Sequence, residues 1–151
     1  MKRQGKNLYG IALTCWVWAA SLLWTVGCGL DRLSTVPAKG TVTLDGKPLA
    51  DANITFTPDR GRSATGKSSA DGTFVLSTYD QGDGAIVGHH LVTVTAREVG
   101  AADTPGAPGI TRPGRSLIPE RYGNTATSGL SFEVTDGPEN VFEIQLTSKE
   151  N

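Results

Sequence analysis

The stretch Lys39-Gly-Thr-Val-Thr-Leu-Asp-Gly-Lys-Pro-Leu-Ala-Asp-Ala-Asn-Ile-Thr-Phe-Thr57 decides the fold of this 151-residue chain. In its first half, Val42 and Leu44 alternate with threonines, and this period of two is typical of a strand with one apolar face. The Asp45-Gly46 pair then supplies the positive φ angles that a tight hairpin turn needs. We therefore predict a strand over residues 40–44 that ends in a turn.

The second half of the stretch predicts another strand, over residues 52–57. Ala52, Ile54 and Phe56 alternate with polar residues, so we expect the three to face the core together. Pro48 stands between the two strands and has no backbone N–H to donate. This makes residues 47–49 a sheet edge or a connector.

Similar alternation recurs further along the chain, at the spacing of an all-β protein. The predicted strands cover residues 64–68, 73–78, 89–97, 130–134 and 141–146. Residues expected to face the core are Phe74, Leu76, His90, Val92, Val94, Leu130, Phe132, Val134, Phe142, Ile144 and Leu146. With about seven short strands and no helical pattern after the N-terminal stretch, the fold class is an all-β sandwich.

Composition supports a turn-rich β protein and argues against nucleic acid as a partner. The chain has 19 glycines and 8 prolines, which favour turns over helices. Its 14 basic residues fall to 11 when Lys2, Arg3 and Lys6 are set aside with the first 27 residues, against 15 acidic ones. A mildly acidic body lacks the basic face that phosphates demand.

The N-terminus has the pattern of an export signal. Residues 1–7 are basic and polar, residues 8–26 carry no charge and are mostly apolar, and Gly27 precedes Cys28. Plain secretion and an uncleaved membrane anchor are the two alternatives, because the apolar run is nearly long enough to span a bilayer.

The Gly27-Cys28 pair resembles the lipobox of bacterial lipoproteins, in which a small residue precedes the cysteine that is acylated. Thr25 departs from that pattern, which favours Leu at this position. The resemblance implies cleavage after Gly27, a diacylglycerol on the Cys28 thiol and an acylated new amine, which together anchor stably. By the same family's sorting rule, Gly29 after the cysteine favours the outer membrane.

These observations divide the chain into three parts. Residues 1–27 are the expected lipoprotein signal peptide, residues 28–37 a lipidated tether and residues 38–148 the β-sandwich domain. Cys15 and Cys28 are the two cysteines of the chain, so the domain can hold neither a disulfide nor a cysteine-based zinc site.

Three blocks of the domain resemble the carboxypeptidase regulatory-like domain, a small transthyretin-like (prealbumin-like) module. They are residues 40–56, residues 69–76 (Ser-Ala-Asp-Gly-Thr-Phe-Val-Leu) and residues 88–94 (Gly-His-His-Leu-Val-Thr-Val). The resemblance covers roughly residues 36–147 and implies a Greek-key sandwich that serves as an accessory module without catalytic residues. His90 departs from it, because the family usually has an aromatic residue there.

Short bacterial lipoproteins that consist of this domain alone share two further features with the chain. One is a Gly-Asp-Gly loop, here residues 82–84, and the other is an Ile-Pro-x-x-Tyr segment, here residues 118–122. We expect Tyr122 to pin the preceding long segment, residues 98–116, to the sandwich. That segment is rich in Gly, Pro and Ala, has no periodicity, and is expected to be a surface loop.

Candidate chemistry within the domain is sparse, and we expect no catalytic residue, cofactor or metal. His89 and His90 are adjacent on a predicted strand, so they point to opposite faces and cannot readily bind one metal. Asp80 and Asp83 lie in a glycine-bearing loop that would suit calcium by ligand type but lacks its usual spacing. A lysine–asparagine isopeptide bond could join Lys39 or Lys47 to Asn140. The simpler interpretation is that these are solvated surface residues.

The sequence therefore favours a membrane-anchored lipoprotein that presents a non-catalytic structural or interaction module at the cell envelope. Expected partners are membrane lipid through Cys28 and an envelope protein or glycan, the latter recognised through the loops 59–69, 79–88 and 98–116. The alternatives are a small-molecule, glycan or calcium-binding accessory lipoprotein and, more remotely, a transthyretin-like hydrolase of the hydroxyisourate type.

Overall fold

The computed structural model describes residues 32–98 and 114–149, and these residues form an all-β protein, as predicted. One 3-10 turn, η2 (Glu120–Gly123), is the helical element of these ranges. The strands are β1 (Thr35–Val36), β2 (Ala38–Leu44), β3 (Lys47–Pro48), β4 (Asn53–Pro58), β5 (Ala64–Lys67), β6 (Thr73–Val75), β7 (Ala85–Ile86), β8 (Gly88–Thr95), β9 (Leu130–Val134) and β10 (Asn140–Leu146). The predicted signal peptide lies outside the described residues.

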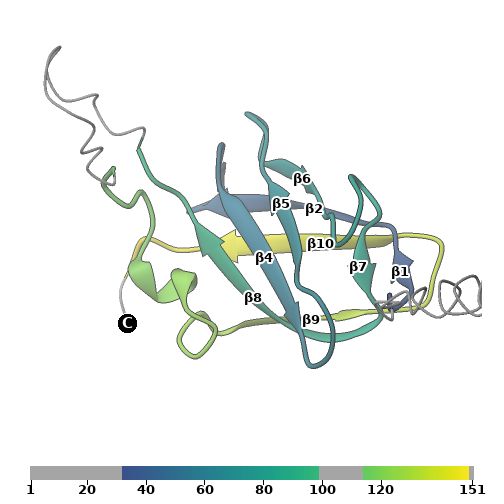
Figure 1. Cartoon of the computed structure of the whole chain (residues 1–151). Coiled ribbons are helices and arrows are strands. Elements are labelled where there is room, and N and C mark those ends of the chain that lie inside the picture. The colour runs from purple at the N-terminus through teal and green to yellow at the C-terminus, as the bar shows by residue number, and fades with distance from the viewer. Residues whose placement is uncertain (1–31, 99–113, 150–151) are drawn as a thin grey trace, which may run out of the picture. The chain divides into compact units, whose positions relative to one another are not determined.

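The strands form two four-stranded sheets and one two-stranded ribbon (Figure 1). One sheet is antiparallel throughout and has the order β5-β4-β8-β9. In the other, β10 runs parallel to β2, and the far edge of β2 is shared by β6 and β3. The ribbon pairs β1 with β7.

The Asp45-Gly46 turn predicted in the opening stretch is present, but the two strands predicted on either side of it do not pair with each other: β2 pairs with β3, whereas β4 belongs to the other sheet. Asp45 and Gly46 both have positive φ, 50° and 79°, as a two-residue hairpin turn requires. The turn pairs Leu44 with Lys47 and Thr43 with Pro48, and β3 ends there as a two-residue edge.

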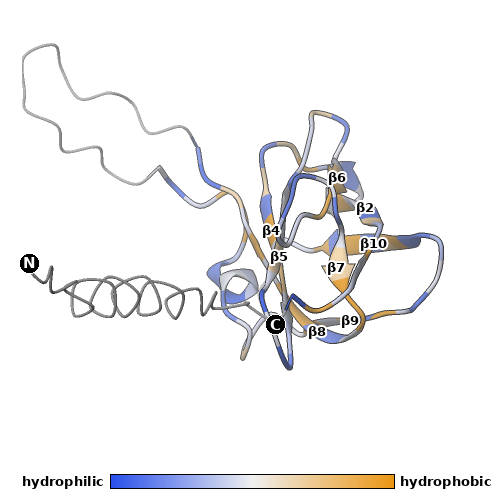
Figure 2. Ribbon diagram, turned by 45° about the vertical axis from the view of Figure 1, so that its right-hand side comes forward, coloured by the Kyte–Doolittle hydropathy of each residue, from blue (hydrophilic) through white to orange (hydrophobic). Residues whose placement is uncertain are grey.

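The two sheets face each other across one core, with Phe56 at its centre. The Phe56 ring centroid lies 5.2 Å from that of Phe142 and 6.5 Å from that of Phe74, both in the opposite sheet. It lies 5.8 Å from Phe132 in its own sheet. Figure 2 shows apolar strand segments between the layers and polar residues in most of the loops. The predicted inward residues are buried there, except that Leu44, Leu130 and Phe132 are only partly covered.

The ribbon of β1 and β7 was not predicted, and it corrects part of the expected tether. Thr35 pairs with Ile86 and Val36 with Ala85, and Val36 is buried in the core cluster. Residues 35–37 are therefore part of the folded domain rather than a free linker. The described chain is already held at Arg32, whose guanidinium lies 3.2 Å from an Asp80 carboxylate oxygen and 4.8 Å from the Tyr79 ring centroid.

Strand β8 separates two ends of the domain. At its start, near Gly88, lie residues 33–34, the β4–β5 loop (58–63), residues 86–89 and residue 136, which we call the tether end. At its finish lie residues 97–98 and 114–124, which we call the loop end. The eight residues of β8 are separated by seven steps of about 3.4 Å, which place these ends about 24 Å apart. They lie toward opposite sides of Figure 1.

Candidate functional site

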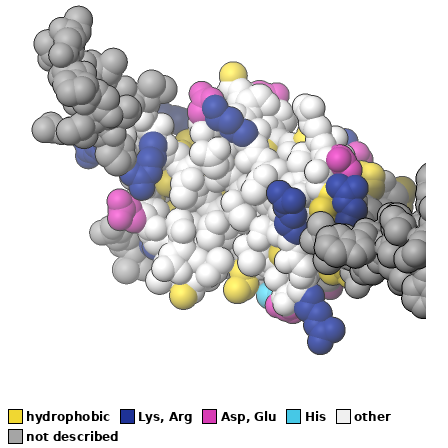
Figure 3. Space-filling model, viewed as in Figure 1, with side chains coloured by type: hydrophobic (Ala, Val, Ile, Leu, Met, Phe, Trp, Pro, Cys, Tyr) yellow, Lys and Arg dark blue, Asp and Glu magenta, His cyan; other side chains and the backbone are white. Residues whose placement is uncertain are grey.

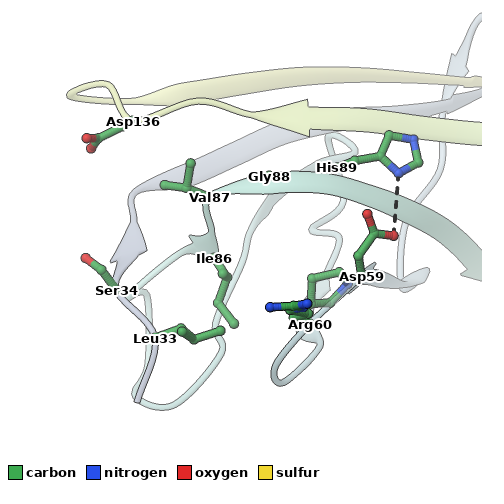
Figure 4. A pocket seen from close by; sticks show the side chains of 10 residues that line it. Leu33, Ser34, Asp59, Arg60, Ile86, Val87, Gly88, His89 and Asp136 are labelled. Carbon is green, nitrogen blue, oxygen red and sulfur yellow. Dashed lines mark ion pairs between the residues drawn. The ribbon is translucent and has the colours of Figure 1, made fainter. Parts of the chain in front are cut away.

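A hollow of about 590 Å³ opens at the tether end (Figure 4). Its apolar wall comes from three segments that are distant in sequence: Leu33 before β1, Pro58 at the end of β4, and Ile86-Val87 at the end of β7. Ser34, Asp59, Arg60, Gly88, His89 and Asp136 complete the lining. Leu33 and Val87 are each 42 % exposed. Two aliphatic side chains that line this hollow are therefore partly in contact with water.

Gly61 allows the β4–β5 loop to lie against this wall. Its φ is +96°, and a Cβ atom there would come within 2.8 Å of both the Leu33 and the Ile86 Cδ1 atoms. The Leu33 and Ile86 side chains would have to turn aside for a Cβ atom there, and the positive φ disfavours any L residue. Gly61 thus lies directly against two side chains of the apolar wall.

The charges on the rim are balanced rather than of one sign. The His89 ring Nδ1 lies 4.0 Å from the Asp59 carboxylate, which Figure 4 marks with a dashed line. Arg60 lies on the same side in Figure 4, and Asp136 stands across the hollow. This arrangement suits a ligand that carries both signs of charge or none.

The two histidines do not meet, as the strand pattern predicted. His90 is fully buried, its Nδ1 donates to the Gly88 carbonyl at 2.9 Å, and its ring centroid lies 6.0 Å from that of Phe56. Its Nε2 has no hydrogen-bond partner. Desolvation lowers the pKa of His90, and the bond to the Gly88 carbonyl offsets this only in part. His90 is therefore a neutral core residue, while His89 faces solvent at the rim.

Asp83 braces the loop that was weighed as a calcium site. Its two carboxylate oxygens accept backbone N–H groups of Thr78, Tyr79 and Asp80, at 2.7, 2.9 and 3.1 Å. Desolvation alone would raise the pKa of Asp83, but these three donors and the nearby Arg32 outweigh it, so the pKa is lowered. The carboxylate is thus engaged in folding its own loop. Asp80 pairs with Arg32 instead of turning toward Asp83.

Two other arrangements considered from sequence are not assembled. Within residues 32–98 and 114–149, no three His, Cys, Asp or Glu side chains come together as a metal-binding group. The Asn140 side chain bonds to the backbone and hydroxyl of Thr135, while Lys39 pairs with Glu139 at 2.8 Å. Lys39 and Asn140 are thus engaged with other partners, which leaves the isopeptide pattern without support.

The loop end is closed by packed side chains. Ile118 and Tyr122 are buried in the core cluster, as predicted for the Ile-Pro-x-x-Tyr segment. The Tyr122 hydroxyl accepts from the Arg121 guanidinium at 2.9 Å and from the Thr147 backbone N–H at 3.1 Å. These bonds tie the segment to the end of β10.

The base of the long segment 98–116 is also fixed at this end. The Glu98 N–H donates to the Arg115 carbonyl at 2.9 Å, and Arg97 bridges to Ser116. The chain therefore leaves and returns at neighbouring points. The segment between them, residues 99–113, lies outside the described residues, as does Cys28. A second hollow, of about 320 Å³, lies beside this base and is lined by Arg97, Ser116, Glu120 and Asn124 among others.

The outward face of the β5-β4-β8-β9 sheet is polar but carries little charge. Thr65, Thr55 and Thr93 form one row across three strands, and Asn53 pairs with Thr95 beside it. Figure 3 shows this side with basic residues scattered around its margin rather than gathered in a patch. The face lacks the basic concentration that nucleic acid requires, which agrees with the composition.

Sequence reasoning missed the hollow because its walls come from four separate loops. The available signals were weak: Leu33 stands between polar neighbours, Ala85-Ile86-Val87 is a short apolar run, and Thr35-Val36 is a β-branched pair. None of these signals indicates which residues of the chain lie next to each other in the folded protein.

Comparison with known proteins yields no relative: no family model, no curated protein and no solved structure matches the chain. Among the described residues, no helix has the length and hydrophobicity to cross a bilayer.

Proposed function

We propose that this chain is a lipoprotein of the bacterial cell envelope, held at the membrane through Cys28, whose β-sandwich is a non-catalytic interaction module. We further propose that the sandwich is a carboxypeptidase regulatory-like domain, which is a prealbumin-like fold with Greek-key connections. In support, the three motif blocks fall on β2 to β4, on β6 and on β8, in the order that the resemblance requires.

One observation carries the proposal: the tether and the long segment 98–116 attach at opposite ends of β8. A chain anchored through Cys28 would hold the tether end near the bilayer and turn the loop end away from it. Loops on a rigid scaffold are where recognition residues are usually found. The loop end is thus the surface proposed to meet an envelope protein or glycan.

The non-catalytic part of the proposal draws on the histidines. His90 is enclosed in the core and His89 stands at the rim, so the two cannot act as a pair on one substrate. If the chain were a hydrolase of the hydroxyisourate type, it would turn over that substrate and lose the activity in His89→Ala.

Acylation is tested by metabolic labelling with a palmitate analogue in a bacterial host. The native chain should take up label and fractionate with membranes, and Cys28→Ser should lose the label. Cys15→Ser is the matched control and should behave like the native chain. Continued labelling of Cys28→Ser would refute the lipoprotein assignment.

A ligand-binding accessory lipoprotein is the second candidate, and the hollow at the tether end favours it. About 590 Å³ lies within the range of roughly 300–1,000 Å³ typical of small-molecule sites. A glycan or small molecule bound there should raise the melting temperature, and Asp59→Asn should weaken the effect. A calcium-dependent rise that disappears in Asp80→Ala/Asp83→Ala would support the calcium alternative instead.

A further inference from the structure

The tether end of the domain combines a short link to the proposed anchor with half-exposed aliphatic side chains. Arg32 is the first described residue and is held in place by Asp80 and Tyr79. The Leu33 backbone N–H also donates to the Tyr79 hydroxyl at 3.2 Å. The contacts that hold the folded domain therefore begin at residue 32.

Covalent geometry limits how far this end can be from an acylated Cys28. Four steps from residue 28 to residue 32 span at most about 14 Å at about 3.3–3.6 Å per residue. Cys28 would sit at the level of the lipid headgroups, whose layer is about 5–8 Å thick on each side of the hydrocarbon core. Arg32 can then stand no more than about 14 Å from that level, so the tether end is confined to the bilayer surface.

We propose that the tether end docks on the surface of a zwitterionic phospholipid bilayer, with Leu33 and Val87 in contact with the interface. This inference rests on the proposed anchoring at the N-terminus and adds to it the face that meets the membrane. Leu33 and Val87 border the same hollow, and Gly61 of the β4–β5 loop lies close to the Leu33 and Ile86 side chains. Apolar area placed at an interface binds in proportion to the area buried.

The charges at this end decide which lipid surface fits. Arg32, Arg60 and Arg62 are matched by Asp59, Asp80 and Asp136, and all six lie exposed on the tether end or its adjoining segment. Glu133, which is exposed and pairs with His89 between β9 and β8, adds one more acid, so positive charge is not in excess at this end. Such a set gains nothing from a negatively charged leaflet, whereas a polybasic patch would. The surface therefore fits phosphatidylethanolamine-type headgroups, which pair a phosphate with an ammonium group.

The test places a fluorophore at one of two matched positions in the full chain, purified from membranes and reconstituted in vesicles with brominated lipids. Val87→Cys carries the label at the tether end, and Leu117→Cys carries it at the loop end. The native side chains are 42 % and 44 % exposed. We expect quenching of the Val87 label to exceed that of the Leu117 label by at least about threefold. Equal quenching would overturn the docking proposal while leaving acylation intact.

The unsubstituted chain separates failure of docking from failure of acylation. If Cys28 is acylated, that chain has no free thiol and takes up no label. If it does take up label, acylation has failed, and the two positions are compared again in a Cys15→Ser/Cys28→Ser background, where an uncleaved apolar segment provides a link of similar length. Recovery of the chain free of membranes would overturn both proposals.

Two further measurements address the chemistry of the contact. Leu33→Ser should lower quenching of the Val87 label toward the Leu117 value, whereas Val141→Ser, at an exposed valine on β10, should not. Adding phosphatidylglycerol to phosphatidylethanolamine vesicles, or adding salt, should leave quenching unchanged. If quenching depended strongly on phosphatidylglycerol or on salt, the domain would bind an anionic surface rather than a zwitterionic one, which would contradict the proposal.

Discussion

The two ends of this sandwich differ in how far their apolar side chains are covered. At the loop end, Tyr122 and Ile118 fill the space between the sheets, and the tyrosine hydroxyl ties down Thr147. At the tether end, Leu33 and Val87 remain half exposed around an open hollow. An end closed by buried side chains contributes to stability, while an end left open has apolar surface available for a partner.

The largest effect is expected at the closed end. Tyr122→Ala should lower the free energy of unfolding by about 3–5 kcal/mol, because it removes a buried ring that the surroundings cannot replace. Tyr122→Phe should lower it by about 1 kcal/mol through the lost hydroxyl bonds. Urea denaturation measures both changes. A small loss in Tyr122→Ala would show that the loop end is not closed by packing.

A backbone contact at the tether end should give the next largest effect. Gly84 has a φ of +87°, and an alanine Cβ there would collide with the Val36 carbonyl oxygen. Gly84→Ala should cost about 2–3 kcal/mol and weaken the β1–β7 ribbon. Gly82→Ala is the matched control: its φ is +75° and its Cβ meets nothing within 4 Å, so it should cost only about 1 kcal/mol. Hydrogen exchange of the β7 amides would locate the change.

The Asp83 brace next to that ribbon should make stability depend on acid. Its folded pKa lies below the unfolded value of about 3.9, so its contribution is complete above that value and is lost as pH falls through the folded pKa. Asp83→Asn should cost about 1–3 kcal/mol at pH 7 and flatten the stability profile below pH 4. An unchanged acid profile would contradict the role of the carboxylate.

His90 should add a second acid-sensitive contribution, at higher pH than that of Asp83, because its folded form is neutral and protonation charges it. Its folded pKa lies below the unfolded value of about 6.5, so the unfolded chain binds more protons and stability falls as pH drops below 6.5. His90→Phe should remove this slope and leave stability at pH 8 within about 1 kcal/mol, since it also removes a buried, unpaired Nε2. His89→Gln should leave the slope in place. Chemical denaturation at several pH values distinguishes them.

The smallest effect on stability is expected from Leu33 and Val87, the half-exposed side chains that line the hollow at the tether end. Leu33→Ala and Val87→Ala should each change the free energy of unfolding by less than about 1 kcal/mol, because both side chains are already half in water. A loss as large as that of Tyr122→Ala would mean that the tether end is a packed core in its own right. The comparison between the ends would then fail.

The core strands were predictable from local pattern, and the candidate site was predictable only in part. Alternation placed Ile54, Phe56, Val92 and Ile144 in the core, and all four are buried. The same alternation separated His89 from His90. It gave no indication of β1 or β7, because two-residue strands are too short to show a period, and they pair across about 50 residues of intervening chain.

The sequence by itself determined the all-β class, the Asp45-Gly46 turn and the inward residues, because a period of two and an Asp-Gly turn act through neighbours along the chain. Which strands pair was decided by the tertiary structure, which places β2 and β4 in different sheets. The acylation site at Cys28 is likewise a prediction of sequence alone. Tertiary structure decided that residues 35–37 belong to the domain, that Asp83 is committed to its own loop and that Leu33, Ile86 and Val87 share one hollow. These depend on contacts such as that between Leu33 and Tyr79, 46 residues apart, which no local pattern encodes.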